Sequence, residues 1–165
     1  MKKLLYLLLI VLIMFHAWGC TYHSSASEPV PFYYQRVQYQ FGSPDGVIAS
    51  EHREAVGHTG DIQYLLTLYL RGPLDPALKS PFPTGTALLD WKQEDRTLSI
   101  TLTNAVTGLD DLALTLACAC LAKTCFEIAS VDTVQIYSGS PTEKNHVDIL
   151  LTPESLLELD TMLSP

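Results

Sequence analysis

Basic residues are scarce in this sequence. Ten Lys and Arg stand against 18 Asp and Glu in 165 residues, which gives a formal net charge of −8 at pH 7 and an isoelectric point near 4.9. Sequence-independent binding of nucleic acid needs a positive surface, and so does docking of a basic segment on anionic lipid. The charge balance therefore argues against both, and we expect no nucleic acid as a partner.

The short motifs that mark many catalytic and metal centres are also missing. The sequence has no HExxH, no paired spacing of metal ligands and no Gly-rich phosphate loop. Two neighbouring acids, Asp110 and Asp111, lie where a helix is expected to begin, and acids there complement the helix dipole without any catalytic role. We predict no catalytic residue, no metal site and no cofactor.

Beyond residue 20 the histidines are scattered: His23, His52, His58 and His146. His52 lies beside Glu51 and near Glu54, and His58 lies three residues before Asp61. Such pairs could hold a metal ion, but no further ligand stands at a matching spacing. Solvated surface histidines explain them better.

No apolar run is long enough to cross a membrane comfortably. The run Leu4–Phe15 has 12 residues, about 18 Å of helix, against a hydrocarbon core of about 30 Å. Behind Lys2 and Lys3 it has the form of a signal peptide, which we place at residues 1–19. A membrane anchor extended through Trp18 is the alternative.

The residues that follow indicate lipid attachment. Ala17-Trp18-Gly19-Cys20 resembles a bacterial lipobox, in which a small residue precedes the cysteine that becomes diacylated. Two acyl chains anchor a protein stably where one does not. We therefore expect a lipid on Cys20, a tether over residues 20–31 rich in Ser, Thr and Pro, and a location on the extracytoplasmic face of the cell membrane.

Three cysteines remain, at Cys118, Cys120 and Cys125. If residues 109–130 form a helix, Cys118 and Cys120 point about 160° apart, and Cys118 and Cys125 are about 10.5 Å apart along the axis, too far for a disulfide. We interpret them as small buried apolar residues. Metal or redox chemistry is the alternative, and their redox state stays open because unpaired cysteines are unusual outside the cytoplasm.

Hydrophobic periodicity predicts an α+β fold of the order ββ-α-ββ-α-β, with two helices on one face of a mainly antiparallel sheet. The expected strands and helices are strands at 32–41 and 47–55, a helix at 61–73, a hairpin at 86–93 and 97–104, a helix at 109–130, a strand at 131–139 and a helix at 152–163.

Several details of these elements are predicted too. Leu98, Ile100 and Leu102 alternate with Ser and Thr, so they should face the core with the Thr side wet. Leu89 and Trp91 should line the same buried face, and Val134 and Ile136 should point inward. The strand 47–55 is polar in its second half, which suggests a sheet edge. Asp61 should cap its helix, and Gly72-Pro73 should end it.

Three stretches in this order carry a family resemblance: DIQYLLTLYLRGP at 61–73, LKSPFPTGTALLDWKQEDRTLSITLTN at 78–104, and VDTVQIYSG at 131–139. They resemble the GerMN domain of sporulation and spore germination proteins. The resemblance implies a domain at 32–140, a C-terminal extension at 141–165, a fold like the ring-building motif of sporulation channels, and no family catalytic residues. It also implies a bacterial envelope lipoprotein, in agreement with Cys20.

We therefore predict a non-enzymatic, membrane-anchored lipoprotein that binds unidentified envelope proteins in spore formation or germination. Residues 47–55 and the Thr-rich face of the hairpin are the expected contact surfaces. The alternative is a cell-surface sensor that binds a ligand and modulates a signalling partner. Its pocket would be lined by Tyr33, Tyr34, Tyr39 and Trp91, although these aromatics also suit a core.

Overall fold

The computed structural model describes residues 29–39, 46–139 and 146–157. In chain order the elements are β1 (Val30–Arg36), β2 (Ile48–Arg53), α2 (Ile62–Leu70), β3 (Leu78–Lys79), β4 (Leu88–Glu94), β5 (Thr97–Leu102), a 3-10 helix η1 (Asn104–Gly108), α3 (Asp111–Ile128), β6 (Thr133–Ser138) and β7 (Val147–Leu151). Residues 153–157 are helical as well. The predicted order of strands and helices is confirmed, with β3 and β7 as additions.

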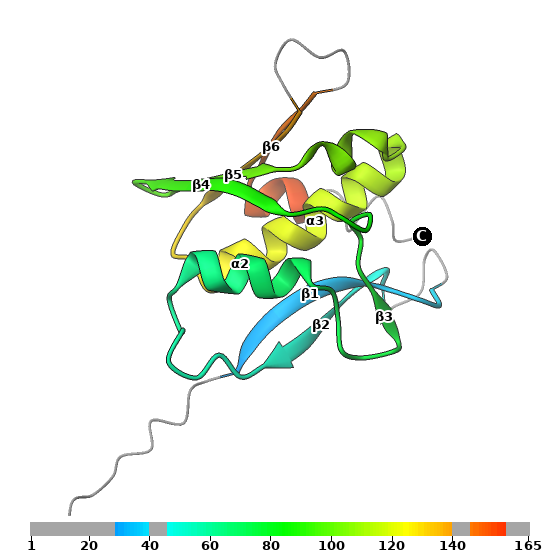
Figure 1. Ribbon diagram of the computed structural model, residues 1–165, viewed down its shortest axis with the longest axis horizontal. Coiled ribbons are helices and arrows are strands. Elements are labelled where there is room, and N and C mark those ends of the chain that lie inside the picture. Colours follow the sequence, from blue (N-terminus) through cyan, green and yellow to red (C-terminus); the bar gives the residue numbers. More distant parts are fainter. Residues whose placement is uncertain (1–28, 40–45, 140–145, 158–165) are drawn as a thin grey trace, which may run out of the picture.

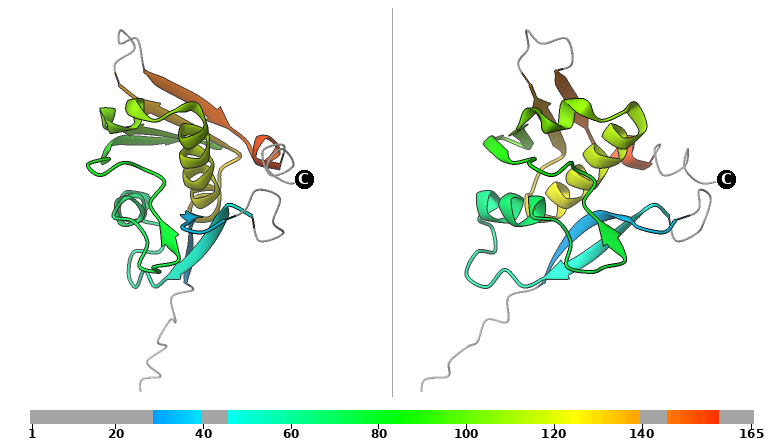
Figure 2. Two further views of the ribbon diagram at one scale, coloured as in Figure 1. Left: turned by 90° about the vertical axis from the view of Figure 1, so that its right-hand side faces the viewer. Right: turned by 45° about the vertical axis from the view of Figure 1, so that its right-hand side comes forward.

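The strands form two sheets with the helices between them. One sheet has the order β2-β1-β3 and the other the order β4-β5-β6-β7. Figure 1 shows α2 and α3 as a middle layer, with β1 to β3 on one side and β4 to β6 on the other, and Figure 2 shows the same layers from two more directions. The predicted α+β class, with helices packed on mainly antiparallel strands, is confirmed, but the strands are shared between two sheets.

The first sheet is built on β1. Its side chains alternate, so that Val30, Phe32 and Tyr34 are buried. β1 pairs antiparallel with β2 over 30–35 and with β3 only at residues 35 and 36. β2 therefore lies at the edge of the sheet, as its polar second half predicted.

The second sheet is built on β5. Leu98, Ile100 and Leu102 are completely buried, and Val134 and Ile136 of β6 are buried beside them, so the predicted inward faces are confirmed. β5 and β6 are parallel because the chain between them crosses through α3. β4 and β7 pair antiparallel on the two sides.

A β-bulge corrects one prediction. Leu88 pairs with Leu102 and Asp90 with Thr101, which leaves Leu89 as an extra residue in β4. A bulge turns the extra residue away from the regular alternation. Leu89 is accordingly 62% exposed, contrary to the prediction, while Leu88 and Trp91 pack against the core.

The helix ends follow the capping rules. The Asp61 carboxylate accepts a hydrogen bond of 3.0 Å from Tyr64 N–H, as predicted for an N-cap. The Asp110 side chain accepts a hydrogen bond of 2.8 Å from Ala113 N–H, so Asp110 is the N-cap of α3. Of the two acids expected in the first turn of this helix, only Asp111 lies within it. α2 ends where Gly72 takes a positive φ of 88°, a conformation that glycine adopts without strain.

The C-terminal helix is described only in part. Thr152 precedes it, and the Thr152 hydroxyl accepts from Ser155 N–H at 3.4 Å, as an N-cap side chain does. Residues 158–163 of the predicted helix lie outside the described residues. None of the described helices has the length and hydropathy needed to cross a lipid bilayer.

Candidate functional site

The three cysteines lie in the most enclosed part of the fold. α3 packs against both sheets, and from Leu116 to Ala122 every residue of the helix is buried. Cys118, Cys120 and Cys125 are at most 1% exposed and carry no disulfide. The predicted burial of all three cysteines is confirmed.

Burial makes these thiols poor nucleophiles. It raises the pKa of Cys118 to about 12 and raises the pKa values of Cys120 and Cys125 as well. The thiolate is the species that reacts with oxidants and binds metals. An interior position of this kind suits a packing role.

The histidines are spread over separate surfaces. His52 is exposed on β2, and His146 is exposed just before β7. The His58 ring stacks on the Tyr64 ring with centroids 3.9 Å apart, and its Nδ1 lies 3.4 Å from the Asp61 carboxylate. Across the described ranges, no three His, Cys, Asp or Glu side chains converge as metal ligands would. His23 and Cys20 lie outside those ranges.

The aromatic residues suggested as a pocket are not brought together. Tyr34 is buried and stacks on Tyr69, with ring centroids 4.9 Å apart. Tyr33 projects from the other face of β1, and Trp91 belongs to the second sheet. Tyr39 follows the end of β1. The interpretation of these aromatics as core is therefore right for Tyr34 and, in part, for Trp91, and the common pocket is wrong.

A tyrosine pair joins β1 of the first sheet to α2. The Tyr34 hydroxyl donates a hydrogen bond of 2.9 Å to the backbone carbonyl of Tyr69. The Tyr69 hydroxyl is buried and has no partner in the part of the chain that the structure describes. Burial, ahead of the neighbouring cysteines, raises the pKa of Tyr69.

Sequence reasoning missed the role of Arg53. Its side chain is 8% exposed and lies over the rings of Phe32 and Tyr34, 5.5 and 5.8 Å from their centroids. It forms an ion pair with Glu51 and donates to the Gly72 carbonyl at 2.5 Å. The guanidinium therefore joins β2 to the turn that ends α2.

Glu51 completes this connection. Its carboxylate accepts hydrogen bonds from Leu74 N–H at 2.8 Å and Asp75 N–H at 2.7 Å. Burial acts to raise the pKa of Glu51, but these hydrogen bonds and Arg53 outweigh it and leave the pKa lowered. A charged residue at an inward position of a strand was the only signal in the sequence for this ion pair.

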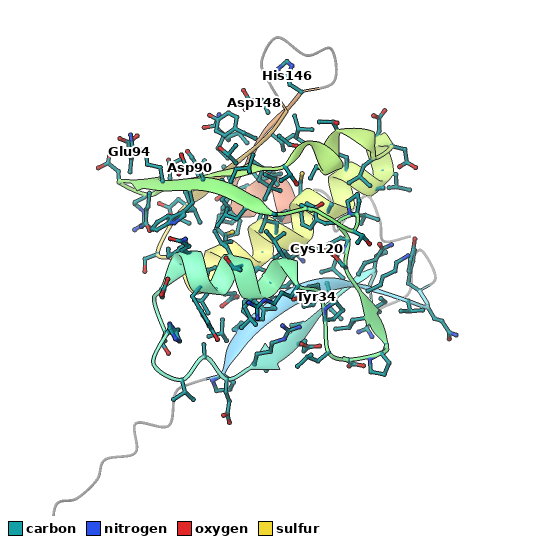
Figure 3. All side chains as sticks on the ribbon, viewed as in Figure 1. Tyr34, Asp90, Glu94, Cys120, His146 and Asp148 are labelled. Carbon is teal, nitrogen blue, oxygen red and sulfur yellow. The ribbon has the colours of Figure 1, made fainter. Side chains whose placement is uncertain are left out.

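The outer face of the second sheet is polar and carries no covering element among the described residues. Thr97, Ser99 and Thr101 of β5 alternate with the buried leucine and isoleucine side chains, so the predicted wet face is confirmed. Acids flank this face on both sides. Figure 3 shows Asp90 and Glu94 along β4 and Asp148 near the far end of the sheet, well apart from the interior Tyr34 and Cys120.

Polar side chains on and beside this outer face interact with one another. The Gln135 amide donates to the Asp148 carboxylate at 3.1 Å, and Lys92 pairs with Glu94 at 2.6 Å. At the hairpin end Arg96 of β4–β5 pairs with Asp132, which precedes β6. The surface thus carries hydroxyl groups and is crossed by polar side-chain interactions.

A hollow of about 400 Å³ opens at the start of β1. Its apolar lining includes Pro29 and Pro31, and its polar groups are His52, Thr59 and Glu127. This volume lies within the range of small-molecule sites, which is about 300–1,000 Å³.

Comparison with known proteins agrees with this architecture. The sequence matches the Germane family, described as sporulation and spore germination, over residues 32–141. The fold is similar to the tandem GerMN domains of the sporulation protein GerM from Bacillus subtilis, with a TM-score of 0.52 and 15% identity. That match covers 79% of this chain and 47% of the other, so this chain spans about half of its length.

A candidate lipoprotein from Clostridium perfringens is also similar. It has a TM-score of 0.49 and 16% identity, and the match covers 78% of this chain and 90% of that one. No curated protein sequence matches the chain significantly.

Proposed function

Because the chain belongs to the Germane family of sporulation and spore germination domains, we propose that it is a non-catalytic lipoprotein that binds envelope proteins in spore formation or germination. The family match gives the biological setting. Membrane attachment and partner binding each rest on a separate observation.

Attachment rests on the N-terminal sequence. Cys20 follows Gly19 at the end of a short apolar run behind two lysines, and diacylation there would give stable anchoring. The described part of the chain begins nine residues after Cys20, at Pro29. The tether expected at residues 20–31 therefore ends earlier than predicted, since β1 begins at Val30.

Partner binding rests on the outer face of the second sheet, which is the observation that carries the proposal. This face presents the hydroxyl side chains of β5, and the acids of β4 and β7 beside them favour a partner with basic groups. Binding of this kind needs no cofactor and no catalytic residue.

The test is a photocrosslink in the spore-forming host. A photoreactive residue replaces Thr101 on the outer face, or Gln63 on the exposed side of α2 as the matched control. Capture of one envelope protein from Thr101 alone, and only during sporulation, supports the proposal. Equal capture from Gln63 contradicts it, and so does full sporulation by a Cys20→Ser strain that releases the protein from the membrane.

A ligand-binding sensor is a second candidate, and the hollow that contains His52, Thr59 and Glu127 favours it. Cell-wall fragments carry amino, carboxyl and hydroxyl groups that such a mixed lining could bind. A rise in the melting temperature with one fragment, lost in Glu127→Gln, would support this role. No shift across a panel of fragments would count against it.

A further inference from the structure

A small groove lies between the end of α2 and the segment that leads into β4. It has a volume of about 240 Å³ and is lined by Thr67, Leu70, Arg71, Thr86, Ala87 and Leu88. Leu70 and Leu88 also pack against the core. Three features of this groove distinguish it from an ordinary surface depression.

The first feature is an unpaired cation. Arg71 is exposed at the C-cap of α2, and no ion pair or hydrogen bond joins its side chain to another described residue. Acids exceed bases 18 to 10 in this chain, so a guanidinium that forms no ion pair with the described residues is notable. The end of the helix favours a cation, but it leaves the donors of the guanidinium free for an anion.

The second feature is an unpaired hydroxyl. Thr86 Oγ1 is buried and has no hydrogen-bond partner among the described residues. Buried polar groups are nearly always paired, and an exception needs an explanation. A ligand that supplies the missing hydrogen bond provides one.

The segment that carries Thr86 is held firmly. Ala87 N–H donates to Thr103 Oγ1 at 3.1 Å, and Thr103 N–H donates to the Ala87 carbonyl at 3.0 Å. The Thr103 hydroxyl also donates to the Gly85 carbonyl at 3.2 Å. A preorganised wall of this kind lowers the entropy cost of binding.

The third feature is Leu89. The bulge in β4 turns this side chain into solvent beside Leu88 of the groove. Bulges frequently re-aim a side chain next to a functional site. Leu89 therefore adds an exposed apolar side chain next in the chain to Leu88 of the groove.

We infer that this groove binds an extended segment of a partner protein in which a carboxylate lies next to an aliphatic side chain. The carboxylate is bound by the Arg71 guanidinium and accepts the Thr86 O–H. The aliphatic side chain packs against Leu70, Leu88 and Leu89. The volume lies below the range of small-molecule sites and suits one or two amino-acid side chains.

This inference deepens the proposed function and rests on it, since it gives the chemistry of one partner segment. It concerns a surface other than the outer face of the second sheet. If the peptide does not bind but Thr101 still captures a partner by photocrosslinking, only the inference about the groove is wrong. If the peptide binds but Thr101 captures no partner, only the proposed contact on the outer face of the second sheet is wrong.

The experiment is a titration of the isotope-labelled full-length chain, kept in a mild nonionic detergent and followed by amide chemical shifts. The probe is a capped pentapeptide, Gly-Leu-Glu-Leu-Gly, and its Gln analogue is the control. We expect shifts centred on residues 67–71 and 86–89 with the Glu peptide, and binding weaker by roughly tenfold with the Gln analogue, since a hydrogen bond to a charged group is lost.

Variants of the protein complete the test. Arg71→Gln should weaken binding roughly tenfold, and Thr86→Val should weaken it severalfold without lowering the melting temperature, because the hydroxyl has no partner to lose. Lys92→Gln, which removes a cation outside the groove, should bind as the wild type does. Equal binding of the Glu and Gln peptides, shifts elsewhere, or shifts at the groove with oleate instead of the peptide would each overturn the inference.

Discussion

The side-chain hydroxyl of Thr124 accepts a hydrogen bond of 2.9 Å from the backbone N–H of Tyr33, 91 residues earlier in the chain. The same hydroxyl donates to the Cys120 carbonyl at 2.9 Å within α3. β3 covers only the last two residues of β1, so the rest of that side of the strand has no strand beside it. α3 occupies the place instead, and Thr124 satisfies a donor that would otherwise be buried unpaired.

Replacing Thr124 with Val tests this link. The two side chains have the same shape, but Val leaves the Tyr33 N–H without an acceptor, and an unsatisfied buried donor costs about 1–3 kcal/mol. We expect the free energy of unfolding, measured in urea, to fall by that amount. Thr115→Val is the matched control, because Thr115 bonds only to the Asp111 carbonyl of its own helix; an equal loss in both variants would contradict the link between α3 and β1.

The buried thiols give a second prediction. With the pKa of Cys118 at about 12 and those of Cys120 and Cys125 also raised, the thiolate fraction at pH 8 is far below that of an ordinary cysteine, whose pKa is about 8.5. Native protein should react with a thiol reagent at least a hundredfold more slowly than protein unfolded in guanidinium. Rapid labelling of native protein at pH 8 would contradict the packing described for α3.

Sequence patterns predicted the parts of this fold that depend on one element at a time. The alternation around Leu98 and Ile100, the cap at Asp61 and the helix end at Gly72 are local, and the structure bears them out. The division into two sheets is not local, since periodicity shows which face of a strand is buried but not which strand lies beside it. A signal for it was nevertheless present: from Leu116 to Ala122 α3 is apolar on all sides, which is typical of a helix covered on two faces.

The candidate functional surfaces also differ in whether a local sequence pattern could predict them. The wet Thr face of β5 follows from alternation and was predictable. The groove joins Arg71 and Thr86, which lie 15 positions apart in separate segments of the chain. The exposure of Leu89 depends on a bulge that the sequence of two adjacent leucines does not reveal. The Arg53–Glu51 pair reaches carbonyls and amides of the 68–75 segment, and no spacing in the sequence encodes such contacts.

The bulge can be tested by comparing Leu88 with Leu89. Leu89 is 62% exposed, so Leu89→Ser should change the free energy of unfolding by less than about 0.5 kcal/mol. Leu88 packs partly against the core, and Leu88→Ser should cost about 1–1.5 kcal/mol, half the value for a fully buried leucine. If Leu89→Ser were the costlier change, β4 would have a regular register without a bulge.

The ion pair predicts a dependence on acid. The folded-state pKa of Glu51 lies below its ordinary value of 4.5, so the stability it contributes is complete above pH 4.5 and is lost as the pH falls through the folded-state pKa. In Glu51→Gln the decline in unfolding free energy between pH 5 and pH 3 should be shallower than in the wild type. The measurement is a series of urea titrations across that range.

At neutral pH the same variant should be less stable by about 3 kcal/mol, because it leaves the Arg53 guanidinium buried without its partner. The double variant Glu51→Met with Arg53→Met removes both charges and should recover much of this loss. A double variant that was less stable than Glu51→Gln would show that Arg53 contributes mainly through its backbone and aromatic contacts.

Removing the hydroxyl group should have opposite effects on stability at Tyr34 and at Tyr69. The Tyr34 hydroxyl bonds to the Tyr69 carbonyl, so Tyr34→Phe should lower the free energy of unfolding by about 1 kcal/mol. The buried Tyr69 hydroxyl has no described partner, so Tyr69→Phe should leave stability unchanged or raise it by about 1 kcal/mol, since a desolvated polar group is removed. Both variants keep the ring stack, and each serves as the control for the other. A loss in Tyr69→Phe as large as in Tyr34→Phe would mean that the Tyr69 hydroxyl is paired in solution, and the interior between α2 and α3 would then hold a hydrogen-bond acceptor for it.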